Sequence, residues 1–508
     1  MNIRSTINVT AALTVVIGLA VFTAVPVSWL MGDPSAVIIK IAMSAAITIV
    51  VGVAAFLLTK VEKYELGKRE GFGIVTFGWI LAAAFGSIPF VTAGHLCWYD
   101  AFFETMSGFT TTGASVLDSS LKLNNGTYLE DGIQGLPYGL LYWRSLTHWL
   151  GGMGIVVLSL AIIPFLGIGG QELYNAEVPG PTSDQLTPKI ANSAKILWGV
   201  YLLLSIVETL LLLPKMPLFD AWCHTCGTMA TGGFSTQQSS IGAYNSVYVD
   251  GIITLFMFLA GGNFILHYRA LRGKPLFHFS DEEFRWYLGI TLFATASITA
   301  VLMLAGKPIK STAGLDIVPS FGAALQYASF QVVSILTTTG FCTADFAVWP
   351  VYAGILLVIL MFIGGCGGST GGGMKVSRFL LLIKYAVAQV ERTLFPRTIT
   401  NVHLNGKRVE TKTLHKVVTF FALFIGLYVI FTLLLALFPD PKMTLDTAAS
   451  ASIASLGNIG PGLANVGATS TYSWMHPAAK LLLTAAMLLG RLEVYTVLVI
   501  LLPSFWKK

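Results

Sequence analysis

The sequence predicts an all-α polytopic membrane protein, made of four related units and an extra N-terminal helix pair. Composition gives the class, because 55% of the 508 residues are hydrophobic and 11% are charged, against about 25% charged residues in soluble domains. No soluble fold has an interior large enough to bury that much apolar surface. A short polar segment that recurs four times between apolar stretches gives the number of units.

Apolar stretches of about 20 residues predict where the chain crosses the bilayer, because a helix of that length spans the hydrocarbon. Ten such stretches occur, at about 8–30, 37–59, 71–93, 138–167, 196–214, 249–270, 287–305, 351–383, 415–438 and 478–503. The first lacks an obvious small-residue cleavage site and leads directly into the second. We therefore expect a retained helix and not a signal peptide.

Lysine and arginine concentrate in the segments 60–69, 269–285 and 375–416, whereas the loops on the opposite side of the apolar stretches hold only scattered lysines. Cytoplasmic loops carry an excess of these residues, so both termini are expected in the cytoplasm. The net charge of +6 is then a signal of topology. Because the basic residues flank spans and form no basic domain, nucleic-acid binding is not expected.

Four 13-residue segments align without gaps. They are AFFETMSGFTTTG at 101–113, AWCHTCGTMATGG at 221–233, ASFQVVSILTTTG at 328–340 and AASASIASLGNIG at 448–460. Each begins with alanine and ends with glycine, and the first and third share seven of thirteen positions. The fourth is the most divergent, and its membership rests mainly on its position in the chain.

Each segment lies between two apolar stretches, opposite the basic loops, and combines a short helix with a polar loop. Irregular backbone cannot face lipid, so it must be surrounded by protein or line a cavity. Four such loops predict helix–pore-loop–helix units around one pore. The expected divisions are a helix pair at 1–65 and pore repeats at 66–170, 190–272, 285–395 and 410–508.

The loop backbone itself suggests the chemistry of the pore. Glycine allows backbone angles that aim successive carbonyl oxygens at a common centre, where they can replace the water around a cation. The preceding short helix directs the negative end of its dipole to the same place. Asp100 and Asp220 immediately precede the first two short helices, and Asp446 lies just before the fourth, which suits a helix N-terminus. The third has Tyr327 instead.

Three further segments carry a family resemblance. They are HWLGGMGIVVLSLAIIP at 148–164, IGGCGGSTGGGMKVSRFL at 363–380 and NIGPGL at 458–463. With the four loops, they resemble the pore-forming subunits of Trk potassium-uptake systems, within the Trk/Ktr/HKT superfamily. The resemblance covers essentially the whole chain. It implies potassium uptake across the bacterial inner membrane and no enzymatic activity, with a potassium/sodium or potassium/proton symporter as the alternative.

The resemblance also implies a homodimer, and a cytosolic ring of regulatory subunits that bind ATP/ADP or NAD(H), with no nucleotide bound by this chain itself. The ligand is the potassium ion. The positions expected to coordinate it are Thr111, Thr112, Gly113, Thr231, Gly232, Gly233, Thr338, Thr339, Gly340, Asn458, Ile459 and Gly460.

Seven glycines fall among the ten residues 364–373, which would break a helix although the apolar stretch continues on both sides. A phosphate-binding loop is disfavoured, because Lys375 does not directly follow glycine. Glycines used only for close helix packing remain an alternative. The favoured interpretation, which the resemblance supports, is a mobile intramembrane gate. Its residues are Gly364, Gly365, Gly367, Gly368, Ser369, Thr370, Gly371, Gly372, Gly373 and Lys375.

Ionisable residues within or beside spans usually face a cavity or a partner. Arg491 is expected either to pair with Glu493 or with the end of a pore helix, or to place a positive charge near the ion-coordinating loops (the selectivity filter) that tunes cation passage. Arg144 is left without a role. His148 is expected to be packed. Cys223 and Cys226 form a CxxC pattern, but no second cysteine pair completes a zinc site, so both are expected to be apolar filler.

Overall fold

The computed structural model describes residues 2–61, 67–154, 190–273, 276–396 and 401–507. At the N-terminus, α1 (Ile3–Phe22) and α2 (Ala24–Leu30) are followed by α3 (Ser35–Leu58). Helices α1 and α3 pack so closely that only glycine fits at two contacts. A Cβ atom on Gly18 would lie 2.6 Å from the Ile49 side chain, and one on Gly52 would lie 2.8 Å from the Val15 side chain. Small residues at a contact let two membrane helices approach in this way. The predicted N-terminal pair is therefore a packed hairpin.

The rest of the chain repeats one pattern, in which a long helix precedes a short one and a loop leads to a further helix. The first repeat contains α4 (Lys68–Gly86), α5 (Ile88–Thr92), α6 (Trp98–Phe109), η1 (Gly132–Gly135) and α7 (Tyr138–Gly152). The second contains α10 (Ile190–Leu212), α11 (Leu218–Met229), η3 (Ser240–Tyr244), α12 (Val247–Ala260) and α13 (Phe264–Leu271).

The third and fourth repeats follow the same order. The third contains α14 (Phe277–Ser280), α15 (Glu282–Ala305), α16 (Phe321–Leu336), η4 (Phe346–Val348), α17 (Val351–Ile363) and α18 (Val376–Leu394). The fourth contains α19 (Thr411–Ala436), α20 (Leu445–Leu456), η5 (Ala464–Val466), α21 (Pro477–Arg491), α22 (Tyr495–Leu501) and α23 (Pro503–Trp506). Two small antiparallel hairpins pair β1 (Ile309–Lys310) with β2 (Asp316–Ile317), and β3 (His403–Leu404) with β4 (Lys407–Arg408).

Six continuous helical segments of the described residues are long and apolar enough to cross a membrane: Ile3–Leu30, Ser35–Leu58, Lys68–Thr92, Ser193–Leu212, Glu282–Ala305 and Thr411–Ala436. Two further candidates are bent pairs, with α12 and α13 at 104° and α21 and α22 at 117°. Of the ten predicted spans, 138–167 runs partly outside the described residues, since 155–189 are not described.

Three predicted spans are not continuous straight helices, namely 249–270, 351–383 and 478–503, and the break in 351–383 is the one that the sequence analysis expects at residues 364–373. The first breaks at Gly261 and Gly262, and the second at the glycine-rich segment between α17 and α18. The third breaks at Glu493 and Val494, whose φ angles of 55° and 56° reverse the helical twist. Hydropathy registers the apolar length of a stretch, and it did not reveal the breaks in 249–270 and 478–503.

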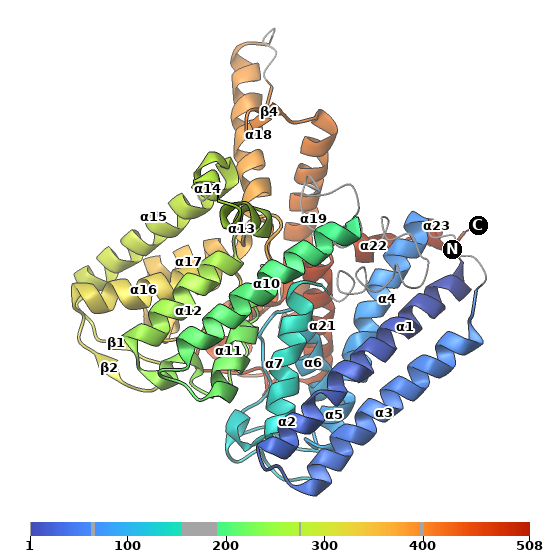
Figure 1. The fold of residues 1–508 in the computed structure, drawn as a ribbon. Coiled ribbons are helices and arrows are strands. Elements are labelled where there is room, and N and C mark those ends of the chain that lie inside the picture. Colours follow the sequence, from blue (N-terminus) through green and yellow to red (C-terminus); the bar gives the residue numbers. More distant parts are fainter. Residues whose placement is uncertain (1, 62–66, 155–189, 274–275, 397–400, 508) are drawn as a thin grey trace.

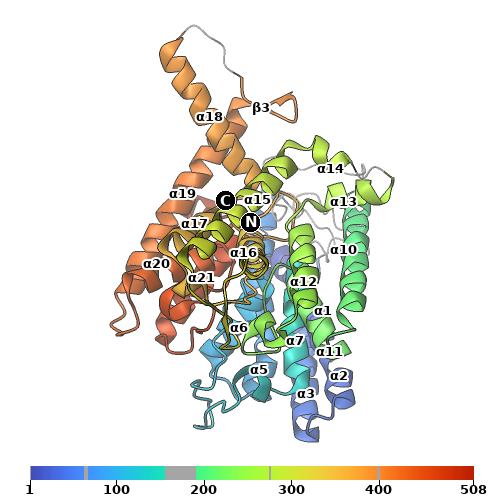
Figure 2. The same cartoon turned by 90° about the vertical axis from the view of Figure 1, so that its left-hand side faces the viewer.

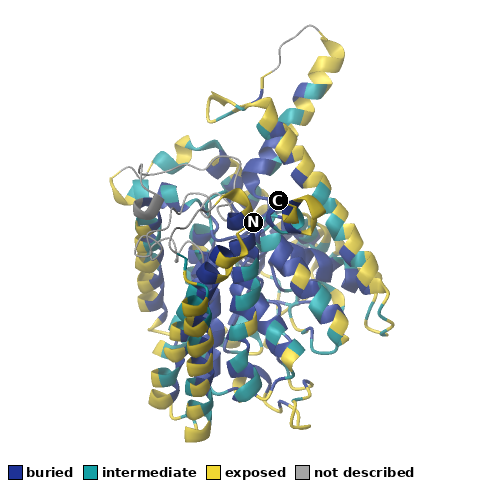
Figure 3. Cartoon of the chain, turned by 90° about the vertical axis from the view of Figure 1, so that its right-hand side faces the viewer, coloured by how far each residue is buried: buried dark blue, intermediate teal, exposed yellow. Residues whose placement is uncertain are grey.

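The repeats form a bundle whose surface suits lipid (Figure 1). Outward-facing apolar side chains are exposed along the long helices, including Ile39, Leu57, Leu304 and Leu433, and the buried residues gather inside (Figure 3). The two chain ends lie side by side, where Arg69 Nη1 donates to Lys507 O at 2.6 Å. Helix α18 projects beyond the rest of the molecule (Figures 1 and 2). The chain is thus a helical membrane protein.

Candidate functional site: a ring of four loops

Four short helices, α6, α11, α16 and α20, each end immediately before one of the recurring polar loops. We call residues 110–113, 230–233, 337–340 and 457–460 the filter loops. Asp100, Asp220 and Asp446 lie in the first turns of α6, α11 and α20, as the sequence predicts, whereas α16 has no acidic residue there. The C-terminal, negative ends of these helices therefore meet the loops.

The four filter loops have the same backbone conformation. The second residue of each loop has a positive φ angle, between 52° and 61°: Thr111, Thr231, Thr338 and Asn458. The closing glycine also has a positive φ, between 78° and 99°: Gly113, Gly233, Gly340 and Gly460. The divergent fourth segment therefore belongs with the others. Three threonines in the left-handed region are unexpected from the sequence, because β-branched residues rarely adopt positive φ angles. Backbone strain of this kind clusters at functional sites.

The third residue of each loop turns its N–H back into the preceding helix. Each donates to the carbonyl five residues earlier, at 2.8–2.9 Å: Thr112 to Ser107, Gly232 to Gly227, Thr339 to Ser334 and Ile459 to Ala454. These N–H groups are therefore satisfied by the preceding short helix and do not bind the carbonyl oxygens of the filter loops.

The loops close into a ring. A Cβ atom built on each closing glycine would lie within 2.6 Å of a carbonyl oxygen in the next loop. These pairs are Gly113 with Gly232 O (2.0 Å), Gly233 with Thr339 O (2.1 Å), Gly340 with Ile459 O (1.9 Å), and Gly460 with Thr112 O (2.6 Å). The order runs from the first loop through the fourth and returns to the first. Only glycine allows this approach, so the closing glycines serve contact between loops as well as backbone conformation.

Outside the ring, the loops of the first and fourth repeats are tied together. Tyr472 donates its hydroxyl to Gly460 O at 2.8 Å and its N–H to Ser115 O at 2.9 Å. Asp118 accepts hydrogen bonds from Ser473 Oγ at 2.5 Å and from Thr471 Oγ1. Burial raises the pKa of Asp118, but the hydrogen bonds donated by Ser120, Ser473 and Thr471 outweigh it and lower that pKa below its usual range.

Directly beside the ring lies the glycine-rich gate segment, which we define as residues 364–375. Thr370 Oγ1 donates to Met229 O at 3.0 Å and to Ala260 O at 3.2 Å. The Gly372 N–H donates to Thr338 Oγ1 at 2.6 Å. The gate segment is therefore hydrogen-bonded to the second and third repeats, next to the filter loops.

The sequence analysis interprets this segment as a mobile gate, and the structure shows the neighbouring contacts that any movement would have to break. A side chain on Gly372 would lie 2.3 Å from Gly457 O, and one on Gly364 would lie 2.4 Å from Gly372 O. The buried Glu283 accepts from the N–H groups of Gly367 (2.7 Å) and Ser377 (2.9 Å). Several glycines are thus required for close packing, and any opening must break these contacts.

Two basic side chains belong to this part of the structure, Lys375 at the end of the gate segment and Arg491 against it. Lys375 is buried and donates to Gly371 O. Arg491 donates through Nη1 to Thr370 O at 2.8 Å and to Thr111 Oγ1 at 3.2 Å. The expected pairing of Arg491 with Glu493 is wrong, because Glu493 pairs with Arg378 at 2.5 Å. The sharp bend between α21 and α22 separates Arg491 from Glu493.

His148, Cys223 and Cys226 are packed inside the protein, as the sequence analysis expects. Phe234 N–H donates to His148 Nε2 at 3.1 Å, so Nε2 carries no proton and Nδ1 donates to Gly108 O at 2.7 Å. Cys223 and Cys226 are fully buried. Within the described residues, no group of three or more His, Cys, Asp or Glu side chains is placed to hold a metal ion.

The sequence analysis missed two buried carboxylates, Glu104 and Glu283, and it named Asp100 without its partner. Glu104 pairs with Arg144 at 2.6 Å and Asp100 pairs with Lys480 at 2.6 Å. For Glu104 the available signal was a charged residue inside a recurring segment that was expected within the membrane, since burying a charge there requires a partner. The identity of that partner could not be read from the sequence.

A bundle of membrane-length helices with four equivalent re-entrant loops closed into one ring defines a polytopic membrane transport protein. The family model described as TrkH, a cation transport protein, matches residues 38–508, and the chain belongs to this family. It is similar to the Trk system potassium uptake protein TrkH of Escherichia coli (strain K12), with 40% identity over 454 residues and 88% of each chain covered.

Other comparisons agree. The Trk system potassium uptake protein TrkG of Escherichia coli is 36% identical, with 88% of each chain covered. The crystal structure of the potassium transporter TrkH from Vibrio parahaemolyticus matches with a TM-score of 0.84 and 33% identity, covering 100% of both chains. These relatives are transporters, and the chain is accordingly a transporter and not an enzyme.

Proposed function

We propose that this protein takes up potassium through the ring of filter loops. The observation that carries the proposal is the closure of four loops of matching backbone into one ring. Carbonyl oxygens of such a ring replace the hydration shell of a cation, and the negative ends of four helix dipoles favour positive charge there. The relatives named as potassium uptake proteins favour potassium over sodium as the ion.

The twelve predicted filter positions enter this proposal with different roles. The carbonyls of Thr112, Gly232, Thr339 and Ile459 each approach the neighbouring loop, so they are the first candidates for ion contact. The side chains of Thr111, Thr231 and Thr338 instead bond to Arg491 or to the gate segment. They connect the filter to the gate.

The gate segment would obstruct the pore on the cytoplasmic side of the filter. Arg491 lies against the segment and Lys375 ends it, and a fixed positive charge such as that of Arg491 opposes the entry of a cation. Opening then requires the loss of the Thr370 and Gly372 hydrogen bonds, so a regulator must supply the free energy. A closed gate released by a partner fits this geometry.

The described parts of the basic segments, in α13, α14, α18 and the starts of α4 and α19, lie with both chain ends on one side of the molecule (Figure 1). We assign that side to the cytoplasm of a bacterial inner membrane, following the positive-inside rule. A homodimer, with a cytosolic regulatory ring binding ATP/ADP or NAD(H) at this face, is part of the same proposal. Helix α18 and the β3–β4 hairpin, which project there, offer the first contact surface.

Flux through purified protein in liposomes tests the ion. We expect potassium and rubidium to be taken up well above sodium under one imposed membrane potential. Equal uptake of potassium and sodium would contradict the proposed selectivity. A steady proton or sodium influx that stops when potassium is withheld would establish symport as the mechanism.

Removing one hydroxyl tests the gate. Thr370→Val keeps the shape of the side chain but loses the hydrogen bonds to Met229 O and Ala260 O, so flux without a regulator should rise. Thr419→Val is the matched control, because its exposed hydroxyl donates to His415 O within its own helix, α19. Unchanged or lower flux in a folded Thr370→Val protein would leave the gate segment as a packing element.

A further inference from the structure

Three of the four short helices carry a polar side chain at the same position of the recurring segment, and each binds the chain just after its filter loop. The fourth residue of the recurring segment is Glu104, His224, Gln331 or Ala451 in repeats one to four. In the first repeat, Glu104 accepts from Ser115 Oγ at 3.0 Å and from Val116 N–H at 3.1 Å. Both partners lie just past Gly113, where the chain leaves the filter loop.

The other repeats anchor the same stretch with neutral groups. His224 Nε2 lies 2.9 Å from Ser235 Oγ, and Gln331 Nε2 donates to Thr343 Oγ1 at 3.3 Å. In the fourth repeat alanine replaces the anchor, and the adjacent Ser450 accepts from Leu463 N–H at 2.9 Å. Every filter loop is thus fastened to its own short helix, but only the first by a charged group.

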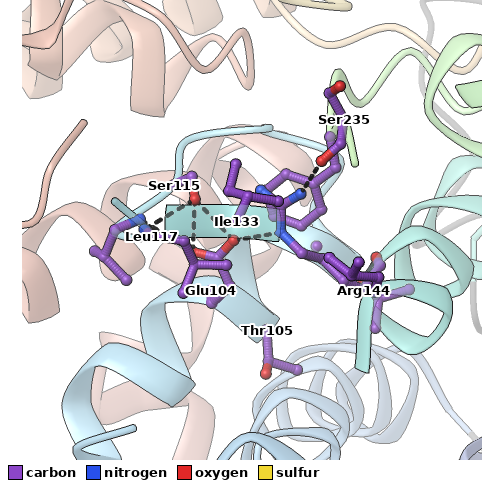
Figure 4. A network of polar contacts seen from close by, with 12 residues as sticks. Glu104, Thr105, Ser115, Leu117, Ile133, Arg144 and Ser235 are labelled. Carbon is purple, nitrogen blue, oxygen red and sulfur yellow. Dashed lines mark hydrogen bonds and ion pairs between the residues drawn. The ribbon is translucent and has the colours of Figure 1, made fainter. Parts of the chain in front are cut away.

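That charged anchor extends into the second repeat (Figure 4). Arg144 Nε donates to Glu104 Oε1 at 2.6 Å, and Arg144 Nη1 donates to Ser235 O at 2.8 Å. The guanidinium carbon lies 3.6 Å from the centroid of the Phe234 ring. Because Phe234 and Ser235 directly follow Gly233, the pair joins the exit of the first filter loop to the exit of the second.

The energetics of such a pair favour a role in geometry. The side chains of Arg144 and Glu104 are 2% and 0% exposed, and removing two charges from water offsets much of their attraction, so buried pairs contribute little net stability. A guanidinium nevertheless presents its donors in a rigid planar fork. It can therefore fix the distance between two backbone segments that a flexible chain would leave variable.

We propose that Glu104 and Arg144 are positioning residues for ion selectivity, which hold the first and second filter loops at a fixed separation. The proposal rests on the proposed function of those loops as the filter. Because Glu104 neutralises Arg144, the pair acts through the geometry of the ring and not through its net charge. Ion discrimination depends on that geometry, since it sets the width and rigidity of the carbonyl ring.

The test compares two buried ion pairs on the same helix. Glu104→Gln disrupts the pair behind the filter, and Asp100→Asn disrupts the control pair with Lys480, which has the same length of 2.6 Å and side chains 3% exposed. Both variants should melt at a lower temperature in detergent. We expect the potassium-to-sodium flux ratio in liposomes to fall about fivefold in Glu104→Gln, the equivalent of one net hydrogen bond, and to stay unchanged in Asp100→Asn.

Rescue by a conservative variant separates positioning from folding. Arg144→Lys keeps a positive charge beside Glu104 but has no fork to reach Ser235 O, so its flux ratio should lie between those of wild type and Glu104→Gln. If Glu104→Gln does not fold, the double variant Glu104→Met with Arg144→Met leaves no unpaired buried charge. It should fold and show the reduced ratio.

The outcomes distinguish this proposal from the filter itself. An unchanged ratio in folded Glu104→Gln, or in the double variant, overturns the positioning role if Gly340→Ala still lowers the ratio. Equal losses of selectivity in Glu104→Gln and Asp100→Asn overturn it as well, because they would reflect general destabilisation. If Gly340→Ala also leaves the ratio unchanged, the filter assignment fails first.

Discussion

Replacing Gly340 by alanine should reduce potassium selectivity more than any comparable change outside the ring. The new Cβ would lie 1.9 Å from Ile459 O, whereas real Cβ contacts essentially never fall below 3.0 Å, so the neighbouring carbonyl must move by about 1 Å. Overpacking of this kind costs about 1–3 kcal/mol. The φ angle of 80° adds left-handed strain, about 1–2 kcal/mol for a residue with a Cβ.

Gly126 supplies the matched control for that strain. Its φ is 86°, but nothing lies within 4 Å of the position that its Cβ would take. Gly126→Ala should therefore carry only the left-handed strain, about 1–2 kcal/mol, and keep wild-type selectivity. The assay is the potassium-to-sodium flux ratio in liposomes, beside a melting curve of each variant. The reasoning is refuted if folded Gly340→Ala keeps the wild-type ratio, or if both alanine variants lose selectivity alike.

Three further predictions follow from contacts around the ring. Arg491→Gln should raise flux without a regulator, because it removes a positive charge and the bond to Thr370 O; no increase in liposomes would place the barrier elsewhere. Because the pKa of Asp118 is lowered, its stabilisation should be present at neutral pH and be lost as pH falls below about 4. Asp118→Asn should remove that acid-sensitive part of the melting temperature between pH 7 and pH 3, and identical pH profiles would disprove it. Lys407→Glu with Arg408→Glu should weaken co-purification with an acidic regulatory partner, and undiminished recovery would move the docking face away from the β3–β4 hairpin.

Much of the architecture can be predicted from the sequence because its causes are local. Apolar length predicts the long helices, and the recurring segment predicts α6, α11, α16 and α20 with their terminating loops. The positive φ angles of Gly113, Gly233 and Gly340 agree with the role expected of glycine. Even the fourth loop could be placed from its position, and Asn458 there is a residue that tolerates the left-handed region.

Tertiary structure decided what depends on partners distant in the chain. The sequence indicates a charge at Arg491. It does not indicate that Thr111 and Thr370, which are 380 and 121 residues away, would accept hydrogen bonds from this side chain. It shows glycines in the gate segment, yet their close approach to Gly457 O and to one another appears only when the repeats are packed. A glycine-rich sequence is compatible with mobility or with tight contact, and only the surrounding atoms select one of them.

The sequence by itself therefore determined that this protein lies in a lipid bilayer, how many repeated units it has and the chemical character of its loops. These follow from hydrophobicity and backbone preference, which each residue carries wherever it lies. The ring, the bends between α12 and α13 and between α21 and α22, and the pairing of Glu104 with Arg144 were decided by the tertiary structure. A buried charge must find a partner, but which partner is available depends on how the four repeats pack together.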